Sequence, residues 1–228
     1  MLDLVLRASV CARWVRRLGL RARGYGCAMR ALLIGSANPG KVAEYRRMLA
    51  GLQVRLVSPD QLDPVPSEPA EGASTYAENA CAKAEAYAAT TGIATVADDS
   101  GLEVDALGGA PGVRSRRYFG ERARPEERNA KLLALMEEAP QRDARFVCVV
   151  ALAYPGGPTE LFEGIVRGEI AKGPRHGEEG WGFGYDPVFI VGGDGRTMAE
   201  LAPEEKDALS HRGLAVAKLR ARLGAEPR

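Results

Sequence analysis

The chain has 228 residues and a formal net charge of +1 at pH 7, from 31 Lys and Arg against 30 Asp and Glu. This length suits one large domain or two small lobes with a sizeable core, and no apolar run approaches the ~18 residues that a membrane span needs. The charge is uneven, because residues 1–28 hold six arginines and one aspartate and leave 25 basic against 29 acidic residues elsewhere. An acidic body argues against a general nucleic-acid binder, which carries a basic stripe over its folded surface. We therefore expect a small-molecule ligand, with no nucleic-acid partner and no membrane partner.

Residues 1–28 differ in composition from the rest of the chain, because they are rich in arginine and nearly free of acids. We expect a disordered or dispensable extension over 1–28, followed by one functional domain over 29–228. Three interpretations stay open: a start set upstream of Met29, which the composition favours, an organellar transit peptide, and a functional basic arm. The four cysteines show neither metal-ligand spacing nor a disulfide-rich pattern, which predicts a cytoplasmic location.

The first predicted strand, residues 31–35, leads through a short loop into a helix. Asn38 is a good N-cap and Pro39 a good first helical residue. A helix start presents backbone N–H groups and a partial positive charge, and Lys41 adds a full charge, so this loop is typical of a phosphate site. The spacing also fits a P-loop, but Val42 stands where a P-loop carries the Ser or Thr that binds magnesium. An ordinary capped connection is the alternative.

A second strand over 53–57 is followed by a proline-rich loop and another helix. A capping box from Thr75 to Glu78 opens this helix, which runs to about Thr91. Lys83 falls close to its start, so it is within reach of the anion that the lysine of the first helix would bind. A solvated surface lysine is the alternative, and for this residue alone it is the favoured one.

The run over 93–97 is typical of a buried strand, and it stops at two adjacent carboxylates, Asp98 and Asp99. Successive strand residues point to opposite faces, so both acids reach one site only if the backbone turns. We expect Ser100 and Gly101 to supply that turn. Ligands bind at the carboxyl ends of strands in open α/β sheets, which predicts that Asp99 faces a metal and phosphates. A solvated Asp-Asp turn is the alternative.

The second half of the chain adds a helix from Pro125, a strand over 144–154 and a hairpin return over 161–166. Residues 178–187 combine glycines, which let a backbone approach a planar ligand, with aromatic side chains. Among these, Phe183 offers a stacking face for a base. A packed surface loop is the alternative. Three arginines precede the helix, and they are either phosphate ligands or the rim of a cleft: Arg114, Arg116 and Arg117.

Five motifs in fixed order carry a resemblance to a known family. They are Ser36-x-Asn38-x-Gly40-Lys41, Thr75-Tyr76-x-Glu78-Asn79-Ala80 with Lys83, Ala97-Asp98-Asp99-Ser100-Gly101-Leu102 running to Arg117-Tyr118, Gly182-Phe183-Gly184-Tyr185-Asp186-Pro187, and Glu205-Lys206 with Ser210-His211-Arg212. Together they resemble the inosine triphosphate pyrophosphatase family, house-cleaning enzymes that hydrolyse nonstandard purine nucleoside triphosphates. The resemblance covers the chain from about Arg30 to Leu223 and leaves out the extension.

The resemblance implies an α/β fold with an elongated mixed β-sheet flanked by helices, two lobes with an active-site cleft between them, and a homodimer. It implies a nucleoside-triphosphate pyrophosphatase that converts dITP, ITP, XTP or dXTP and water to the monophosphate and pyrophosphate. It also implies Mg²⁺ as the cofactor. Two rivals stay open: a nucleotide-binding sensor, which would not need the acids, and a divergent P-loop NTPase, which Val42 disfavours.

The family's functional residues carry over by position. Asp99 is implied to be the proton acceptor, and Glu71 and Asp99 to hold the magnesium ion, with Lys83 and Asp98 as supporting residues. The residues implied to contact the nucleotide are Ser36, Ala37, Asn38, Pro39, Gly40, Lys41, Ser100, Phe183, Gly184, Tyr185, Asp186, Lys206, His211 and Arg212. A donor such as Arg212 opposite the 6-oxo group of hypoxanthine or xanthine would face the 6-amino group of adenine, which predicts selectivity against ATP. Asp207 replaces an Asn of many relatives, which leaves the local base contacts open.

Overall fold

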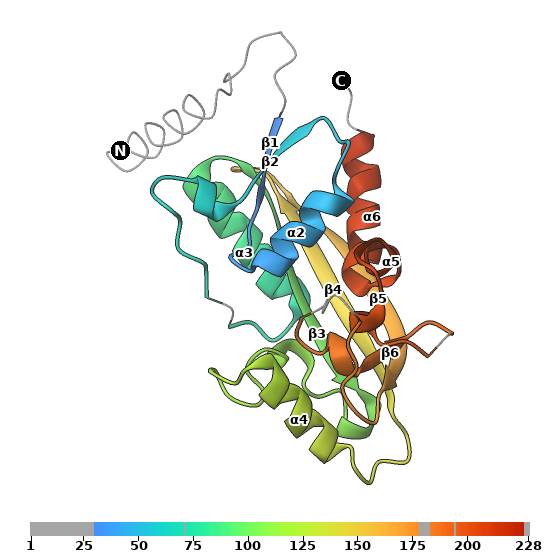
Figure 1. The fold of residues 1–228 in the computed structure, drawn as a ribbon. Helices are drawn as coiled ribbons and strands as arrows, with labels where there is room; N and C mark the ends of the chain where they lie inside the picture. The colour runs from blue at the N-terminus through green and yellow to red at the C-terminus, as the bar shows by residue number, and fades with distance from the viewer. Residues whose placement is uncertain (1–29, 71, 178–182, 194, 226–228) are drawn as a thin grey trace. The chain divides into compact units, whose positions relative to one another are not determined.

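The computed structural model describes residues 30–70, 72–177, 183–193 and 195–225, which form two compact units (Figure 1). Unit 1 comprises the described residues up to Asp98 together with 150–161 and 219–225, and unit 2 comprises those of 99–149 and 162–218. The number of units agrees with the two lobes that the resemblance implies, while the active-site cleft stays a prediction. The expected extension over 1–28 lies outside the described residues.

The strands form one mixed six-stranded sheet in the order β2-β1-β3-β4-β5-β6, which confirms the predicted fold class. β1 pairs in parallel with β2 and with β3, whereas β5 and β6 are antiparallel. The fifth strand is about twice as long as the predicted 161–166. The strand bounds are β1 Arg30–Ile34, β2 Val54–Val57, β3 Ala94–Val104, β4 Asp143–Ala153, β5 Thr159–Ile170 and β6 Phe189–Val191.

Two helices, α2 (Pro39–Met48) and α3 (Tyr76–Thr91), belong to unit 1 together with the short turn η1 (Pro59–Gln61). α3 begins where predicted, because the Thr75 hydroxyl accepts the Glu78 N–H at 3.2 Å, and it ends at Gly92 in the left-handed conformation, with φ of 67°. The strands and α3 share a core of Leu33, Val57, Leu62, Tyr87 and Ile93. This core fixes the end of β1, from which the predicted phosphate loop starts.

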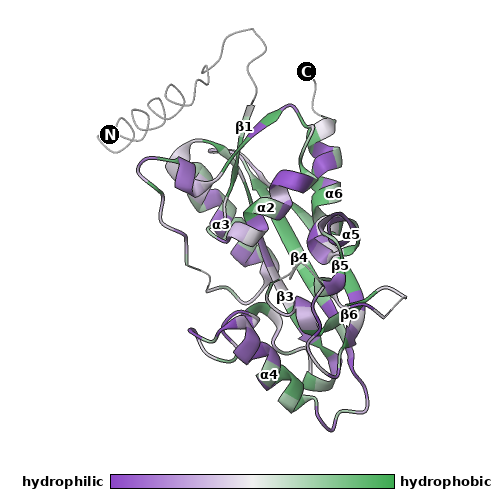
Figure 2. Ribbon diagram, viewed as in Figure 1, coloured by the Kyte–Doolittle hydropathy of each residue, from purple (hydrophilic) through white to green (hydrophobic). Residues whose placement is uncertain are grey.

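Unit 2 contains the helices α4 (Pro125–Leu135) and α5 (Pro203–Leu209) and the first residues of α6 (His211–Gly224). Its short turns are η2 (Asp105–Leu107), η3 (Gly112–Arg114), η4 (Asp186–Val188) and η5 (Met198–Glu200). β4 is apolar along most of its length in Figure 2 and nearly continuously buried, as expected for a central strand covered on both faces. Within the described ranges, no helix has the length and apolar character needed to cross a membrane.

The predicted turn at Ser100 and Gly101 is wrong. β3 continues from Ala94 through both acids and both of these residues to Val104. Asp98 and Asp99 are therefore successive residues of one strand, and side chains of successive strand residues leave on opposite faces.

The loop after β3 explains why the strand continues. The Leu102 N–H donates to Ser115 Oγ at 2.8 Å, and the Val104 N–H donates to the Ala110 carbonyl at 3.1 Å. These bonds satisfy backbone groups that an open strand edge would leave unpaired. The Ser-Gly pair is a turn signal in sequence, but this edge pairing outweighs it.

Candidate active site

The predicted phosphate loop joins β1 to α2 and has the expected cap. Asn38 Oδ1 accepts the N–H groups of Gly40 at 2.9 Å and Lys41 at 3.4 Å, and the Asn38 N–H donates to Ser36 Oγ at 3.1 Å. Ala37, Asn38 and Pro39 are exposed, whereas Ser36 is buried. The loop is thus held by its own hydrogen bonds and presents its tip to solvent, as an anion site at a helix start requires.

Asp98 brings the two predicted lysines of unit 1 together. Lys41 Nζ lies 2.9 Å from Asp98 Oδ2, and Lys83 Nζ donates to the Asp98 carbonyl oxygen at 3.1 Å. Lys83 is buried, so the surface-lysine alternative is wrong. Two ammonium groups that come from different helices and meet at one residue provide the positive charge that a triphosphate needs.

Asp99 and Ser100 open the part of β3 that belongs to unit 2. Asp99 is 6 % exposed, and its Oδ1 accepts the Ser100 N–H at 2.9 Å. Ser100 Oγ accepts a hydrogen bond from Arg212 Nη2 at 3.1 Å. Because successive side chains of a strand alternate, Asp99 leaves the strand on the face opposite to this Ser100–Arg212 contact.

The predicted base-binding residues meet around Phe183. Asp186 accepts the Phe183 N–H at 2.8 Å and pairs with Lys206 Nζ at 2.8 Å. Lys206 Nζ also lies 4.4 Å from the centre of the Phe183 ring, and the Arg212 guanidinium carbon lies 5.5 Å from it. One ring thus has two cations over it, which is a cation–π arrangement, and both cations are buried. This turn and its neighbours can hold a flat ring and offer it hydrogen-bond donors.

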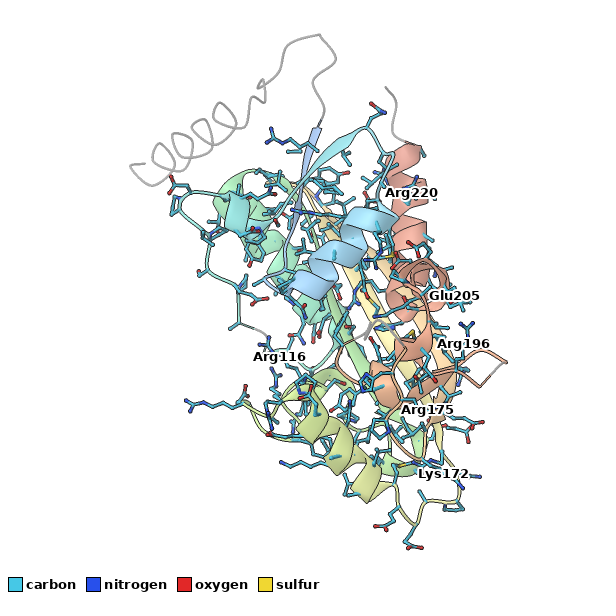
Figure 3. The ribbon with its side chains drawn as sticks, in the orientation of Figure 1. Arg116, Lys172, Arg175, Arg196, Glu205 and Arg220 are labelled. Atoms are coloured by element: carbon cyan, nitrogen blue, oxygen red, sulfur yellow. The ribbon has the colours of Figure 1, made fainter. Side chains whose placement is uncertain are left out.

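The first turn of α6 and the short helix α5 are both braced. The His211 ring stacks on Phe146 with centroids 4.5 Å apart, which places the imidazole against the core of unit 2. Figure 3 shows Arg196 and Glu205 close together, and their two hydrogen bonds are 3.0 Å each. Since Lys206 follows Glu205 on α5, this bidentate pair also restrains the lysine that faces Phe183.

Tyr185 differs from the other predicted nucleotide contacts. Its side chain is 4 % exposed, belongs to the core cluster of unit 2, and donates its hydroxyl to the Ser115 carbonyl at 2.9 Å. Burial raises the pKa of this phenol to about 12, so it stays a neutral donor at physiological pH. Ser115 was not predicted from sequence, because its partners are distant along the chain and a serine after a glycine-rich loop carries no signal of its own.

Some predicted residues are not covered by the structure. Glu71, the expected second metal ligand, lies outside the described residues, as does the segment 178–182 of the glycine- and aromatic-rich run. Within the described ranges, no three His, Cys, Asp or Glu side chains gather closely enough to hold a metal ion. The magnesium site therefore stays a prediction.

A capped helix start with convergent lysines, in a mixed sheet, defines a nucleotide-binding type of α/β protein. The model of the Ham1 family matches residues 32–222, and the chain belongs to this family. It is 46 % identical to a dITP/XTP pyrophosphatase of Deinococcus deserti over 87 % of this chain and 91 % of the relative. It is 49 % identical to a dITP/XTP pyrophosphatase of Geobacillus kaustophilus over 84 % of this chain and 93 % of the relative.

Solved structures agree with this assignment. A HAM1 protein from Coxiella burnetii superposes with a TM-score of 0.78 at 40 % identity, covering 87 % of this chain and all of that chain. The dITP/XTP pyrophosphatase from Mycobacterium abscessus superposes with a TM-score of 0.65 at 45 % identity, covering 83 % and 98 %. The fold and the sequence thus point to the same family.

Proposed function

We propose that this chain hydrolyses nonstandard purine nucleoside triphosphates, namely dITP, ITP, XTP and dXTP, to the nucleoside monophosphate and pyrophosphate. The observation that carries the proposal is its similarity to proteins named dITP/XTP pyrophosphatase, at 46 % identity over 87 % of this chain and more than nine-tenths of each relative. The substrate is a small molecule, and the reaction removes unwanted nucleotides from the pool.

The phosphate chain binds at the loop from Ser36 to Lys41. The helix start supplies a partial positive charge, and Lys41 and Lys83 supply two full charges, which together offset the negative triphosphate. Asp98 keeps these lysines in place. In the bound state, phosphate oxygens compete with the Asp98 carboxylate for Lys41.

Asp99 accepts the proton of the attacking water while the phosphoanhydride bond of the substrate breaks. The Asp99 side chain is 6 % exposed, and its carboxylate oxygens are the groups that would take this proton. Glu71 and Asp99 would hold Mg²⁺, a hard cation that prefers carboxylate oxygens and that would supply positive charge against the charge developing on the phosphates. The donor set fits the metal because it consists of oxygen ligands only.

The purine stacks on Phe183, and hydrogen-bond donors around that ring select the base. Arg212 donates to a 6-oxo group, which hypoxanthine and xanthine have and adenine lacks. The neighbouring residues complete the pocket, with Tyr185 contributing its backbone and not its side chain: Ser100, Gly184, Tyr185, Asp186, Lys206 and His211.

We also infer a cytoplasmic homodimer, as the family resemblance implies. Light scattering at increasing protein concentration tests the dimer, and a single species with the mass of one chain contradicts it.

Turnover with defined nucleotides tests the function. The protein is incubated with ITP, XTP, GTP and ATP, with Mg²⁺ and with chelator, and the phosphorus product is identified. Pyrophosphate from ITP and XTP in excess over ATP is expected. Orthophosphate would instead indicate a P-loop type enzyme, and bound but uncleaved nucleotide would indicate a sensor.

A further inference from the structure

We propose that Ser115 and the hydroxyl of Tyr185 form a positioning device that holds the base-binding turn, so that the Tyr185 side chain acts on the nucleotide only through Phe183. The proposal rests on the proposed function and assigns roles to two side chains within it. Ser115 is not among the site residues predicted from the motifs. Tyr185 was predicted to contact the nucleotide, and the proposal makes it a positioning residue instead.

Ser115 is a junction between three segments of unit 2. It is 8 % exposed, its Oγ accepts the Leu102 N–H at 2.8 Å, and its hydroxyl donates to the Gly112 carbonyl at 2.7 Å. Its own carbonyl accepts the Tyr185 hydroxyl at 2.9 Å. The Ser115 hydroxyl thus serves as acceptor and donor at once, and an alanine at this position would leave the buried Leu102 N–H without this acceptor.

The junction reaches the base-binding residues from two directions. Leu102 follows Ser100 by two residues on β3, and Ser100 is the acceptor for Arg212. Tyr185 lies within the turn that Phe183 and Asp186 close, through the Phe183 N–H bond to Asp186 Oδ2 and the Asp186 N–H bond to the Phe183 carbonyl at 3.3 Å. Ser115 therefore connects the strand that carries Ser100 to the turn that carries the stacking ring.

The next residue adds a second restraint on the same loop. Arg128 Nη1, from α4, donates to the Arg116 carbonyl at 2.8 Å, while the Arg116 side chain, labelled in Figure 3, is exposed. Consecutive carbonyls at 115 and 116 thus accept from two different elements of unit 2. Because the loop at 115 and 116 is held by these hydrogen bonds, the bond from the Tyr185 hydroxyl to the loop restrains the turn that contains Phe183.

Loss of this restraint should weaken binding of the base and leave the phosphate chemistry intact. In Tyr185→Phe the ring still fills the core, but the turn is free to shift, so Phe183 spends less time where it stacks. Stacking acts equally on bound substrate and transition state, and uniform binding appears in KM and not in kcat. We expect KM for ITP to rise about five- to tenfold, with kcat within about twofold, from the loss of one buried hydrogen bond.

Two ligands separate the base end from the phosphate end. The dissociation constant of IMP, measured by calorimetry, should rise by the same factor as KM, while the inhibition constant of pyrophosphate should not change. The matched control is Tyr87→Phe, because this tyrosine is also buried and its hydroxyl has no hydrogen-bond partner among the described residues. Its KM should stay within about twofold of the parent.

A double variant tests whether the two residues act as one unit. Ser115→Ala should raise KM in the same direction, and Ser115→Ala with Tyr185→Phe should be less severe than the product of the single effects. An unchanged KM in Tyr185→Phe, a parallel rise in the inhibition constant of pyrophosphate, or multiplicative single effects would each overturn the proposal. If the parent chain does not hydrolyse ITP, the proposed function fails, and the IMP titration alone then tests the positioning role. Weaker IMP binding in Tyr185→Phe than in the parent supports that role. Absence of IMP binding to the parent overturns it.

Discussion

Asp98 keeps two cations of unit 1 in place while it is itself almost completely buried. Its carboxylate pairs with Lys41 and its carbonyl accepts from Lys83. A buried ion pair is costly to form, but removal of one partner is costlier still, because it leaves the other charge without compensation. The pair therefore makes a prediction that separates stability from activity.

Lys41→Met should lower the free energy of unfolding by about 3 kcal/mol, since the buried Asp98 carboxylate loses its ion pair with Lys41. Lys41→Met combined with Asp98→Asn removes both charges and should recover much of that loss. Activity should not recover, because the phosphate chain still lacks the charge of Lys41. Urea unfolding and ITP turnover on the same samples check this, and a double variant that regains turnover would show that Lys41 serves the fold alone.

Asp99→Asn keeps the size of the side chain but removes its capacity to accept a proton. The rate at saturating ITP and Mg²⁺ should fall by about 10²- to 10⁴-fold, which is the usual loss for a general base. IMP binding should remain, because no base contact is altered. Asp105→Asn, on an exposed turn, is the control. A rate within threefold of the parent would remove Asp99 from the mechanism.

Arg212 and Phe183 should differ in their effect on base selectivity. Phe183→Ala removes a stacking face that all purines share, so kcat/KM for ITP, XTP and residual ATP should fall together, by about 1–3 kcal/mol. Arg212→Ala removes a donor for an oxo group and should narrow the ratio of ITP to ATP. The ratio is insensitive to any general loss of folded enzyme. A shift of the ratio in Phe183→Ala alone would mean that the two roles are reversed.

At the residue scale, the sequence motifs predicted which side chains form the candidate site, but not which distant residues these side chains contact. The cap formed by Asn38 and the charge at Lys41 follow from local rules, and the structure has the predicted cap. Ser115 and the orientation of Tyr185 depend on contacts 13 and 70 residues apart in sequence, which no local pattern encodes.

At the level of elements, α6 is placed by close contact with β5 at Gly164. A Cβ on Gly164 would collide with the His211 carbonyl oxygen and lie 2.6 Å from the Ala215 N–H nitrogen. Only glycine allows the strand and the helix to approach so closely. This contact fixes the start of α6, which carries Arg212.

Gly164→Ala should therefore displace the helix start as well as destabilise the fold. We expect a loss of about 1–3 kcal/mol in the free energy of unfolding, as for other overpacked sites, together with a rise in KM for ITP. Gly173→Ala is the matched control, because a Cβ there meets nothing within 4 Å and its backbone is not in the left-handed region. Equal melting temperatures for the two variants would contradict the contact.

The two ends of α3 and the end of β3 show when local sequence signals are enough to predict where an element begins or ends. Thr75 and Gly92 act on their own helix, so their signals predict its bounds correctly. The Ser-Gly pair after Asp99 is an equally strong turn signal, but Ser115 and Ala110 supply acceptors to the strand edge and extend β3. Tertiary pairing outweighs local propensity where a strand edge would otherwise stay unpaired.

On the scale of the whole molecule, each unit has its own apolar core and its own part of the predicted site. Unit 1 contains the phosphate loop and both lysines, and unit 2 contains Asp99 and the base-binding turn. In sequence, the division falls between the two acids, Asp98 and Asp99. The core clusters described above include a buried tyrosine in each unit: Tyr87 in unit 1 and Tyr185 in unit 2.

From these two tyrosines we predict how the stability of each unit falls as the pH becomes alkaline. Burial raises the pKa of both phenols to about 12, and for Tyr87 the charge of Glu68 adds to the effect. The unfolded value is about 10, so the unfolded chain releases these protons first, and the associated stability is present below pH 10 and lost as the pH rises toward 12. Calorimetric melting temperatures from pH 8.5 to 11.5 should fall less steeply in Tyr87→Phe and in Tyr185→Phe than in the parent, and the change in slope is independent of any hydrogen bond lost at neutral pH. If the units unfold together, each substitution flattens one common transition. If they unfold separately, Tyr87→Phe reduces the pH dependence of the melting temperature of unit 1 only, and Tyr185→Phe that of unit 2 only. A pH dependence equal to that of the parent in both variants would show that these phenols do not govern alkaline unfolding.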